Sequence, residues 1–122
     1  MPHHDTDAFD ARLRQWRKAG GRGRAWIAVE SLYSMGGDSP DLTDLLAVAS
    51  RHYAILVIDE AHATGVLGAD GRGLAAPFEG HDNVITLHTC GKALGTSGGF
   101  VLAPKIVRDF LVNRARHACA SR

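Results

Sequence analysis

Three residue types that can act together in catalysis follow two apolar stretches of this sequence. Residues 54–58 (AILVI) form an apolar run, and Asp59 and His62 come soon after it. Further along, Lys92 lies in a glycine-rich turn (GKALG) beyond a second apolar segment. Because the carboxyl ends of parallel strands meet at one edge of a sheet, we expect the three side chains to lie close together. An acid, a histidine and a lysine in this arrangement can form the protein side of a pyridoxal 5'-phosphate (PLP) site.

Each side chain would have its own part in such a site. Lys92 would bind the cofactor covalently, Asp59 would keep the pyridine nitrogen protonated, and His62 would meet the ring. Simpler interpretations exist for all three residues. A lysine is usually a solvated side chain, and a lone histidine among seven is usually unremarkable. For Asp59, capping of the next turn and cofactor binding are equally supported by the residues alone.

Four ordered motifs resemble those of one enzyme family. They are residues 29–35 (VESLYSM), 59–65 (DEAHATG), 71–73 (GRG) and 89–95 (TCGKALG). Together they resemble the α-oxoamine synthases, which are PLP-dependent acyltransferases, from about His3 to about His117. Any one motif would be a weak signal, but the order and spacing of four make the resemblance specific.

The resemblance implies roles for five residues. Lys92, His62 and Asp59 would be catalytic, and the same three residues with Ser34 and Thr89 would bind PLP. Ser34 and His62 would lie near the phenolic oxygen of the cofactor, and Thr89 near its phosphate. Without the resemblance, Ser34 is a turn residue and Thr89 a β-branched strand residue.

Two points in the motifs need comment. Gly36 stands where the family commonly has aspartate, and this change is expected to loosen the loop that holds Ser34. The GRG motif at residues 71–73 lies near the site in the family, but the sequence assigns it no role beyond that of a surface turn.

The resemblance also implies an activity. Enzymes of this family condense an amino acid, here alanine, with an acyl-CoA or acyl-carrier-protein thioester and release CO₂. Glycine with acetyl-CoA or succinyl-CoA, and serine with a long acyl chain, are the alternatives. The intact enzyme would be a cytoplasmic homodimer that acts on small molecules, with no nucleic acid or membrane as partner.

Members of the family are several times longer than this chain of 122 residues. We therefore expect residues 1–122 to be part of the PLP-binding large domain, without the family's N-terminal segment and C-terminal small domain. The isolated chain is then expected to be inactive, because the ring-stacking residue and the domain that closes over the substrate come from elsewhere.

Two other interpretations stay open. Residues 55–62 (ILVIDEAH) also match the acidic box of helicase-type NTPases, in which the acid holds Mg²⁺. That chemistry needs a glycine-rich loop ending in Gly-Lys-Ser/Thr before the box, whereas Gly91-Lys92 comes after it and is followed by Ala93. The third interpretation is an inactive remnant that keeps the fold and makes no product.

Composition is typical of a water-soluble folded chain. Hydrophobic residues make up 45%, charged residues 22%, and the formal net charge is +1, which gives no reason to expect a nucleic-acid or acidic partner. The two cysteines, Cys90 and Cys119, form no disulfide framework, which favours a reducing compartment. No histidine spacing indicates a metal site. The N-terminus lacks an apolar signal core, and residues 54–58 are too short to span a membrane.

The pattern of apolar residues predicts an α/β fold. The expected strands are residues 26–29, 54–58, 84–87 and 100–103, and the expected helices are residues 6–19, a helix capped by Ser39 with Pro40 first, and a helix opened by Pro104. In the last helix, Ile106, Val107, Phe110 and Leu111 are expected to face inward. Alternating strands and helices predict a mostly parallel sheet with flanking helices, as in part of a PLP-dependent transferase of fold type I.

Overall fold

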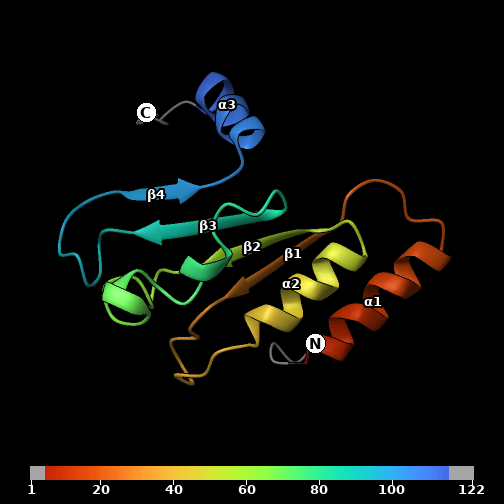
Figure 1. Ribbon diagram of the computed structural model, residues 1–122, viewed down its shortest axis with the longest axis horizontal. Helices are drawn as coiled ribbons and strands as arrows, with labels where there is room; N and C mark the ends of the chain where they lie inside the picture. Colours follow the sequence, from red (N-terminus) through yellow and green to blue (C-terminus); the bar gives the residue numbers. More distant parts are fainter. Residues whose placement is uncertain (1–4, 116–122) are drawn as a thin grey trace.

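The computed structural model of the chain describes residues 5–115 and shows an α/β architecture (Figure 1). The elements in chain order are α1 (Thr6–Lys18), β1 (Trp26–Glu30), α2 (Leu42–Arg51), β2 (Ile55–Asp59), the short 3₁₀ helices η1 (Ala69–Gly71) and η2 (Ala76–Phe78), β3 (Val84–Thr89), β4 (Gly99–Leu102) and α3 (Lys105–Arg114). Every predicted strand and helix is present, with its ends moved by at most two residues.

Side-chain caps fix the starts of the first two helices. Asp5 accepts a hydrogen bond from the N–H of Ala8 (2.9 Å) at the start of α1. The second helix begins later than predicted, because Asp41 rather than Ser39 is its cap and accepts from the N–H of Asp44 (3.0 Å). Both residue types cap helices well, so the sequence alone did not decide between them.

The sheet has the strand order β1-β2-β3-β4. The first three strands are parallel, and Asp59 at the end of β2 pairs with Glu30 of β1 and with Leu87 of β3. Strand β4 runs antiparallel to β3, with His88 opposite Phe100. The prediction of a mostly parallel sheet is therefore confirmed, and β4 is its one antiparallel strand because the loop between β3 and β4 returns the chain directly.

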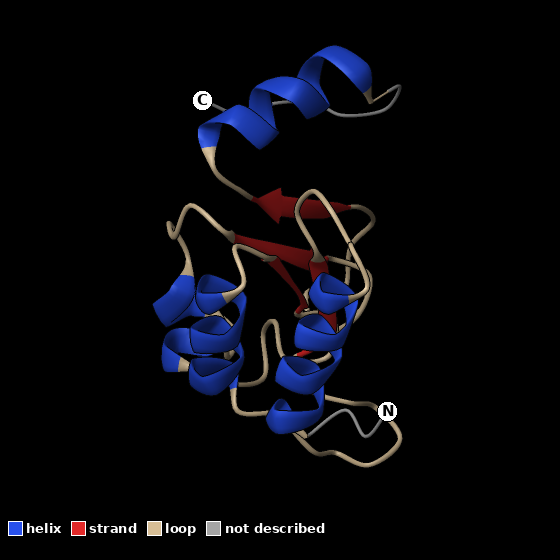
Figure 2. Ribbon diagram, turned by 90° about the vertical axis from the view of Figure 1, so that its right-hand side faces the viewer, coloured by secondary structure: helices blue, strands red, loops and turns tan. Residues whose placement is uncertain are grey.

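The core lies between the sheet and the first two helices. Figure 2 shows α1 and α2 side by side on one side of the sheet. Leu45 of α2 meets Leu56 and Ile58 of β2 in a cluster of fully buried side chains. The helix α2 presents its apolar stripe at helical spacing, and the parallel strand β2 is apolar on both faces.

An ion cluster around Asp10 joins α1 to α2. The Asp10 carboxylate lies 2.8 Å from Nε2 of His52, 2.8 Å from Arg51 and 2.6 Å from Arg14. The hydrogen bond from His52, then the hydrogen bond from Arg51 and the charges of Arg14 and Arg51, hold the pKa of Asp10 below its usual value. This polar contact supplements the apolar packing of the helix pair.

The third helix does not pack as predicted. Figure 2 shows α3 beyond β4, away from α1 and α2. Ile106 is 80% exposed and Phe110 62% exposed, so the expectation that they face inward is wrong. The helix itself forms because Pro104 opens it and the apolar spacing suits a helix. Val107 and Leu111 are partly buried, and no residue of α3 is fully buried.

Three structural observations bear on the predicted class of protein. Among the helices of residues 5–115, none is long and apolar enough to cross a membrane. In the same range, His, Cys, Asp and Glu side chains form no group of three that is placed to hold a metal ion. Cys90 is a free thiol, and Cys119 lies outside the described residues.

Candidate functional site

The contact between Lys92 and His62 joins two segments that follow neighbouring strands. His62 lies in the turn after β2, and Lys92 lies in the loop after β3. Lys92 Nζ is 2.7 Å from His62 Nε2. The sequence prediction that these two residues lie together is therefore confirmed by the geometry. The Lys92 side chain is open to solvent, so its amine can be reached from outside.

Asp59 is the last residue of β2 and is half-buried. One carboxylate oxygen accepts a hydrogen bond from the N–H of Ala61 (2.8 Å), which is the turn-capping contact expected of a strand-end aspartate. Within residues 5–115, the second oxygen has no hydrogen bond. Capping and ligand binding are thus compatible, because one oxygen serves the turn and the other is open to a donor.

Thr89 is the last residue of β3, and its hydroxyl oxygen accepts from the N–H of Gly91 (3.3 Å). Within the described chain the hydroxyl proton has no acceptor, so it can be given to a ligand oxygen. The following loop closes through backbone bonds from Cys90 to Gly98 and from Thr96 to Cys90, both 2.9 Å. Lys92 is therefore displayed on a short, backbone-bonded hairpin loop.

Ser34 lies apart from these residues, in the loop after β1. It is exposed, and in the part of the chain that the structure describes it has no hydrogen bond to Asp59, His62, Thr89 or Lys92. Its loop is nevertheless held by two backbone bonds between Tyr33 and the segment 37–38 (2.8 and 2.9 Å). The structure thus brings together four of the five predicted residues at two adjacent strand ends, and leaves Ser34 on the third.

At Gly36, where the sequence departs from the family pattern, the space for a side chain is occupied by Asp38. A Cβ at Gly36 would lie 2.0 Å from Oδ1 of Asp38. The carboxylate of Asp38 thus takes the space beside the backbone that a side chain at position 36 would enter. The neighbouring hollow is lined by Glu30, Tyr33 and Ser34. Among the described residues, one buried carboxylate oxygen of Glu30 has no hydrogen-bond partner.

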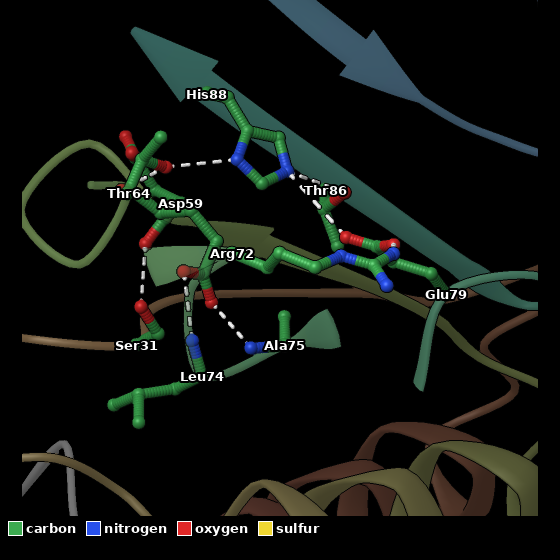
Figure 3. Close-up of polar contacts among 10 residues, drawn as sticks. Ser31, Asp59, Thr64, Arg72, Leu74, Ala75, Glu79, Thr86 and His88 are labelled. Atoms are coloured by element: carbon green, nitrogen blue, oxygen red, sulfur yellow. Dashed lines mark hydrogen bonds and ion pairs between the residues drawn. The ribbon is translucent and has the colours of Figure 1, made fainter. Parts of the chain in front are cut away.

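Glu60, to which the sequence analysis gave no role, holds the GRG motif in place. Its side chain is fully buried and accepts hydrogen bonds from the N–H groups of Leu74 (3.0 Å) and Ala75 (2.6 Å) (Figure 3). Gly73 has a φ of +96°, and a Cβ there would lie 1.9 Å from Glu60 Oε2. Strand periodicity carries a usable signal, since Glu60 falls on the same side as buried Leu56 and Ile58.

The residues present fit a PLP cofactor in chemical type. The site offers an accessible primary amine, a carboxylate with an open oxygen and a threonine hydroxyl. Around Lys92 the backbone is also open, because a Cβ built at Gly95 or Gly98 would meet nothing within 4 Å. An aldehyde, a ring N–H and a phosphate are the complementary ligand groups.

Comparison with known proteins agrees with this donor set. The sequence profile of the aminotransferase class I and II family matches residues 1–122. The chain belongs to this family. Within it, the resemblance to α-oxoamine synthases is confirmed, because the similar proteins described next are α-oxoamine synthases.

Two relatives and one solved structure illustrate the similarity. The chain is 44% identical over 106 residues to 8-amino-7-oxononanoate synthase of Acidithiobacillus ferrooxidans, covering 85% of this chain and 27% of that protein. It is 44% identical over 117 residues to the enzyme of the same name from Mycolicibacterium smegmatis, covering 94% and 30%. A structure of SPT with a PLP internal aldimine superimposes with a TM-score of 0.78 at 30% identity, covering 93% of this chain and 28% of the other.

The chain spans less than a third of the length of the curated relatives that it matches. The similarity therefore shows the family and the fold type, with its mostly parallel sheet and flanking helices. Activity, substrates and partners of a whole enzyme belong to the proposal that follows.

Proposed function

We propose that residues 1–122 form one wall of the PLP site in the large domain of an α-oxoamine synthase. The observation that carries this proposal is the 2.7 Å contact between Lys92 Nζ and His62 Nε2. His62 lies three residues after Asp59, whose carboxylate has an open oxygen. The relatives named 8-amino-7-oxononanoate synthase favour that enzyme of biotin biosynthesis, with alanine and an acyl thioester as substrates.

Each residue of the wall has a defined task. Lys92 binds the cofactor through Nζ and later takes the proton from Cα of the amino acid, for which its reach and solvent access suit it. Asp59 accepts the N–H of the pyridine ring. Thr89 donates to the phosphate, and Ser34 with His62 donates to the phenolic oxygen. When bound, PLP withdraws electrons from the substrate Cα, so that this proton can leave.

The rest of the catalytic apparatus comes from outside this wall. In the proposal, the intact enzyme is a cytoplasmic homodimer with an N-terminal segment and a small domain that close over the substrate. The 122-residue chain by itself is then inactive in acyl transfer, because a site open to water lacks closure and desolvation. Glycine or serine as the amino acid is the alternative within the same family, and SPT among the similar structures keeps that alternative open.

One structural feature weighs against the helicase-type alternative. A phosphate-binding P-loop joins a strand to a helix, whose N-terminus faces the phosphates. The Gly91-Lys92 pair instead lies in the loop between β3 and the antiparallel strand β4. The loop therefore lacks the helix end that this chemistry requires.

Borohydride trapping tests the role of Lys92. The chain is incubated with excess PLP, reduced, digested and analysed by mass spectrometry. We expect the reduced label predominantly on Lys92, because His62 contacts its amine and Asp59 ends the neighbouring strand. The only other lysines, Lys18 and Lys105, lie on helix surfaces and serve as internal controls. Equal labelling of all three lysines, or labelling of Lys18 or Lys105 in preference to Lys92, would contradict the proposal.

A further inference from the structure

A buried histidine lies directly beneath the candidate site. His88 is the residue before Thr89 on β3, and its side chain is 2% exposed. One face of the ring stacks on Phe100 of β4, with 4.5 Å between ring centroids and 5° between the ring planes. A polar ring in this position must satisfy both of its nitrogens inside the protein.

The hydrogen bonds around His88 define which nitrogen carries the proton (Figure 3). The hydroxyl of Thr64 lies 2.8 Å from the carbonyl oxygen of Glu60, which can only accept, so the hydroxyl proton points there. Thr64 Oγ1 also lies 2.8 Å from Nδ1 of His88, so a hydroxyl that donates to the carbonyl accepts from Nδ1–H. The proton of the neutral ring is thus on Nδ1.

The other ring nitrogen has two neighbours at different distances. Nε2 of His88 lies 3.0 Å from the hydroxyl of Thr86, which can donate to it. The carboxylate of Glu79 is farther, at 3.9 Å, and is already paired with Arg72 at 3.1 Å. The nearer partner therefore satisfies Nε2 as an acceptor, in agreement with the proton on Nδ1.

These contacts join the two halves of the candidate site. The carbonyl of Glu60 also accepts the backbone N–H groups of Ala63 and Thr64, so it anchors the turn that carries His62. The chain Glu60–Thr64–His88 thus runs from that turn to the strand that leads into Thr89 and Lys92. The His88 ring therefore helps to fix the turn that carries Asp59 and His62 against the strand that leads to Thr89 and Lys92.

We propose that His88, as the Nδ1–H tautomer, is a positioning residue that ties the turn bearing Asp59 and His62 to the strand leading to Thr89 and Lys92. The inference rests on the proposed function, since a positioning role requires that these residues bind PLP. The strap itself, from Glu60 through Thr64 to His88, is a property of the chain without cofactor and can be tested separately.

The first test is the tautomer. Long-range ¹H–¹⁵N correlation spectra of the labelled chain at neutral pH report which ring nitrogen of His88 is protonated. We expect the Nδ1–H form. Thr64→Val, which removes the acceptor but keeps the shape, should shift the tautomer ratio toward Nε2–H by about fivefold, the effect of one hydrogen bond. A wild-type ring protonated on Nε2 would overturn the assignment.

The second test separates positioning from simple filling of space. His88→Asn places an amide near the Nδ1 position, His88→Gln places it near Nε2, and His88→Phe keeps only the stack on Phe100. Exchange of the Thr64 amide should accelerate roughly fivefold in the Gln and Phe variants and stay within about twofold in the Asn variant. Far-UV circular dichroism verifies that each variant is folded. Equal exchange in all variants would mean that the ring only fills space, and the proposal would be wrong.

The third test links the strap to the site. In His88→Gln, borohydride labelling of Lys92 relative to Lys18 should fall by about the same factor as exchange of the Thr64 amide rises. In His88→Asn, the labelling should be retained. Unchanged labelling in the Gln variant would refute positioning. If the wild-type chain does not label Lys92, the proposed function and the positioning role fail together. The tautomer and exchange results would then still decide whether the strap exists.

Discussion

The N-terminal and C-terminal regions of this chain differ in how deeply their apolar side chains are buried. In the region from α1 to β2, Leu45, Leu56 and Ile58 are at most 1% exposed and lie in the core between the sheet and the first two helices. In the region from Cys90 to Arg114, no residue is buried, and Phe100 of β4 is 42% exposed. The apolar side chains of the second region are as suited to a core as those of the first, but no layer covers them.

The candidate site lies across the boundary of these regions. Asp59 and His62 follow β2 and are fixed to the buried region, whereas Lys92 lies on the open loop after β3. Segments with few buried apolar contacts open locally at low free energy. We therefore infer that the acid and histidine are the rigid part of the site, and that the lysine loop is the part that adjusts.

The largest expected effect tests the contrast in burial directly. Leu56→Ala removes a fully buried side chain and should lower the free energy of unfolding by about 2–5 kcal/mol, from lost transfer energy and a cavity. The matched change Phe110→Ala in α3 should cost no more than about 0.5 kcal/mol, because the ring is exposed. Denaturant unfolding monitored by circular dichroism measures both. Similar losses for the two variants would show that α3 is covered in solution.

A smaller effect on the free energy of unfolding is expected at Glu60, which follows Asp59 of the candidate site. Glu60→Gln keeps the shape but turns an NH₂ group toward backbone N–H donors, which should cost about 1–3 kcal/mol of unfolding free energy. Glu79→Gln is the matched control, because it weakens a partly exposed ion pair with Arg72 and should cost about 1 kcal/mol or less. A cost at Glu79 equal to that at Glu60 would argue that the GRG segment is held by its surface pair instead.

The smallest effect concerns pH and the helix pair of the buried region. The pKa of Asp10 is lower in the folded chain than its usual 3.8, so the unfolded chain takes up this proton first as the pH falls. Its stabilisation is present above about pH 4 and is lost as the pH drops through the folded-state pKa. Below pH 4, the unfolding free energy of Asp10→Asn should depend less steeply on pH. The difference in slope should correspond to the uptake of less than about one proton on unfolding. Identical slopes in both proteins would refute this account.

Local chemistry made most of the fold predictable from sequence. The pattern of apolar residues predicted a helix over residues 6–19, which is α1, and the apolar run before Asp59 predicted β2. The direction of β4 was not predictable, because a run of four apolar residues has no polarity of its own. The exposure of Ile106 and Phe110 was not predictable either, since periodicity shows that a helix has an apolar face but not what covers it.

The candidate site was predicted where it follows strand ends and missed where it depends on packing. The rule for carboxyl ends of parallel strands was enough to bring His62 beside Lys92. The placement of Ser34 depends on the path of a loop, which the sequence does not fix. Glu60 and His88 were missed because each is the sequence neighbour of a predicted site residue. Successive side chains of a strand face opposite sides of the sheet, so a neighbour of a site residue points away from the site.

The close approach of Gly73 to Glu60 makes the two positions interdependent in evolution. With glutamate at 60, a Cβ at position 73 would lie 1.9 Å from the carboxyl group, and the φ of +96° disfavours any side chain there. A descendant of this chain could not change position 73 first and repair position 60 afterwards without passing through a damaged form. The second glycine of the GRG turn is thus constrained twice, by the acid beneath it and by its own backbone conformation, and a substitution there requires both to change.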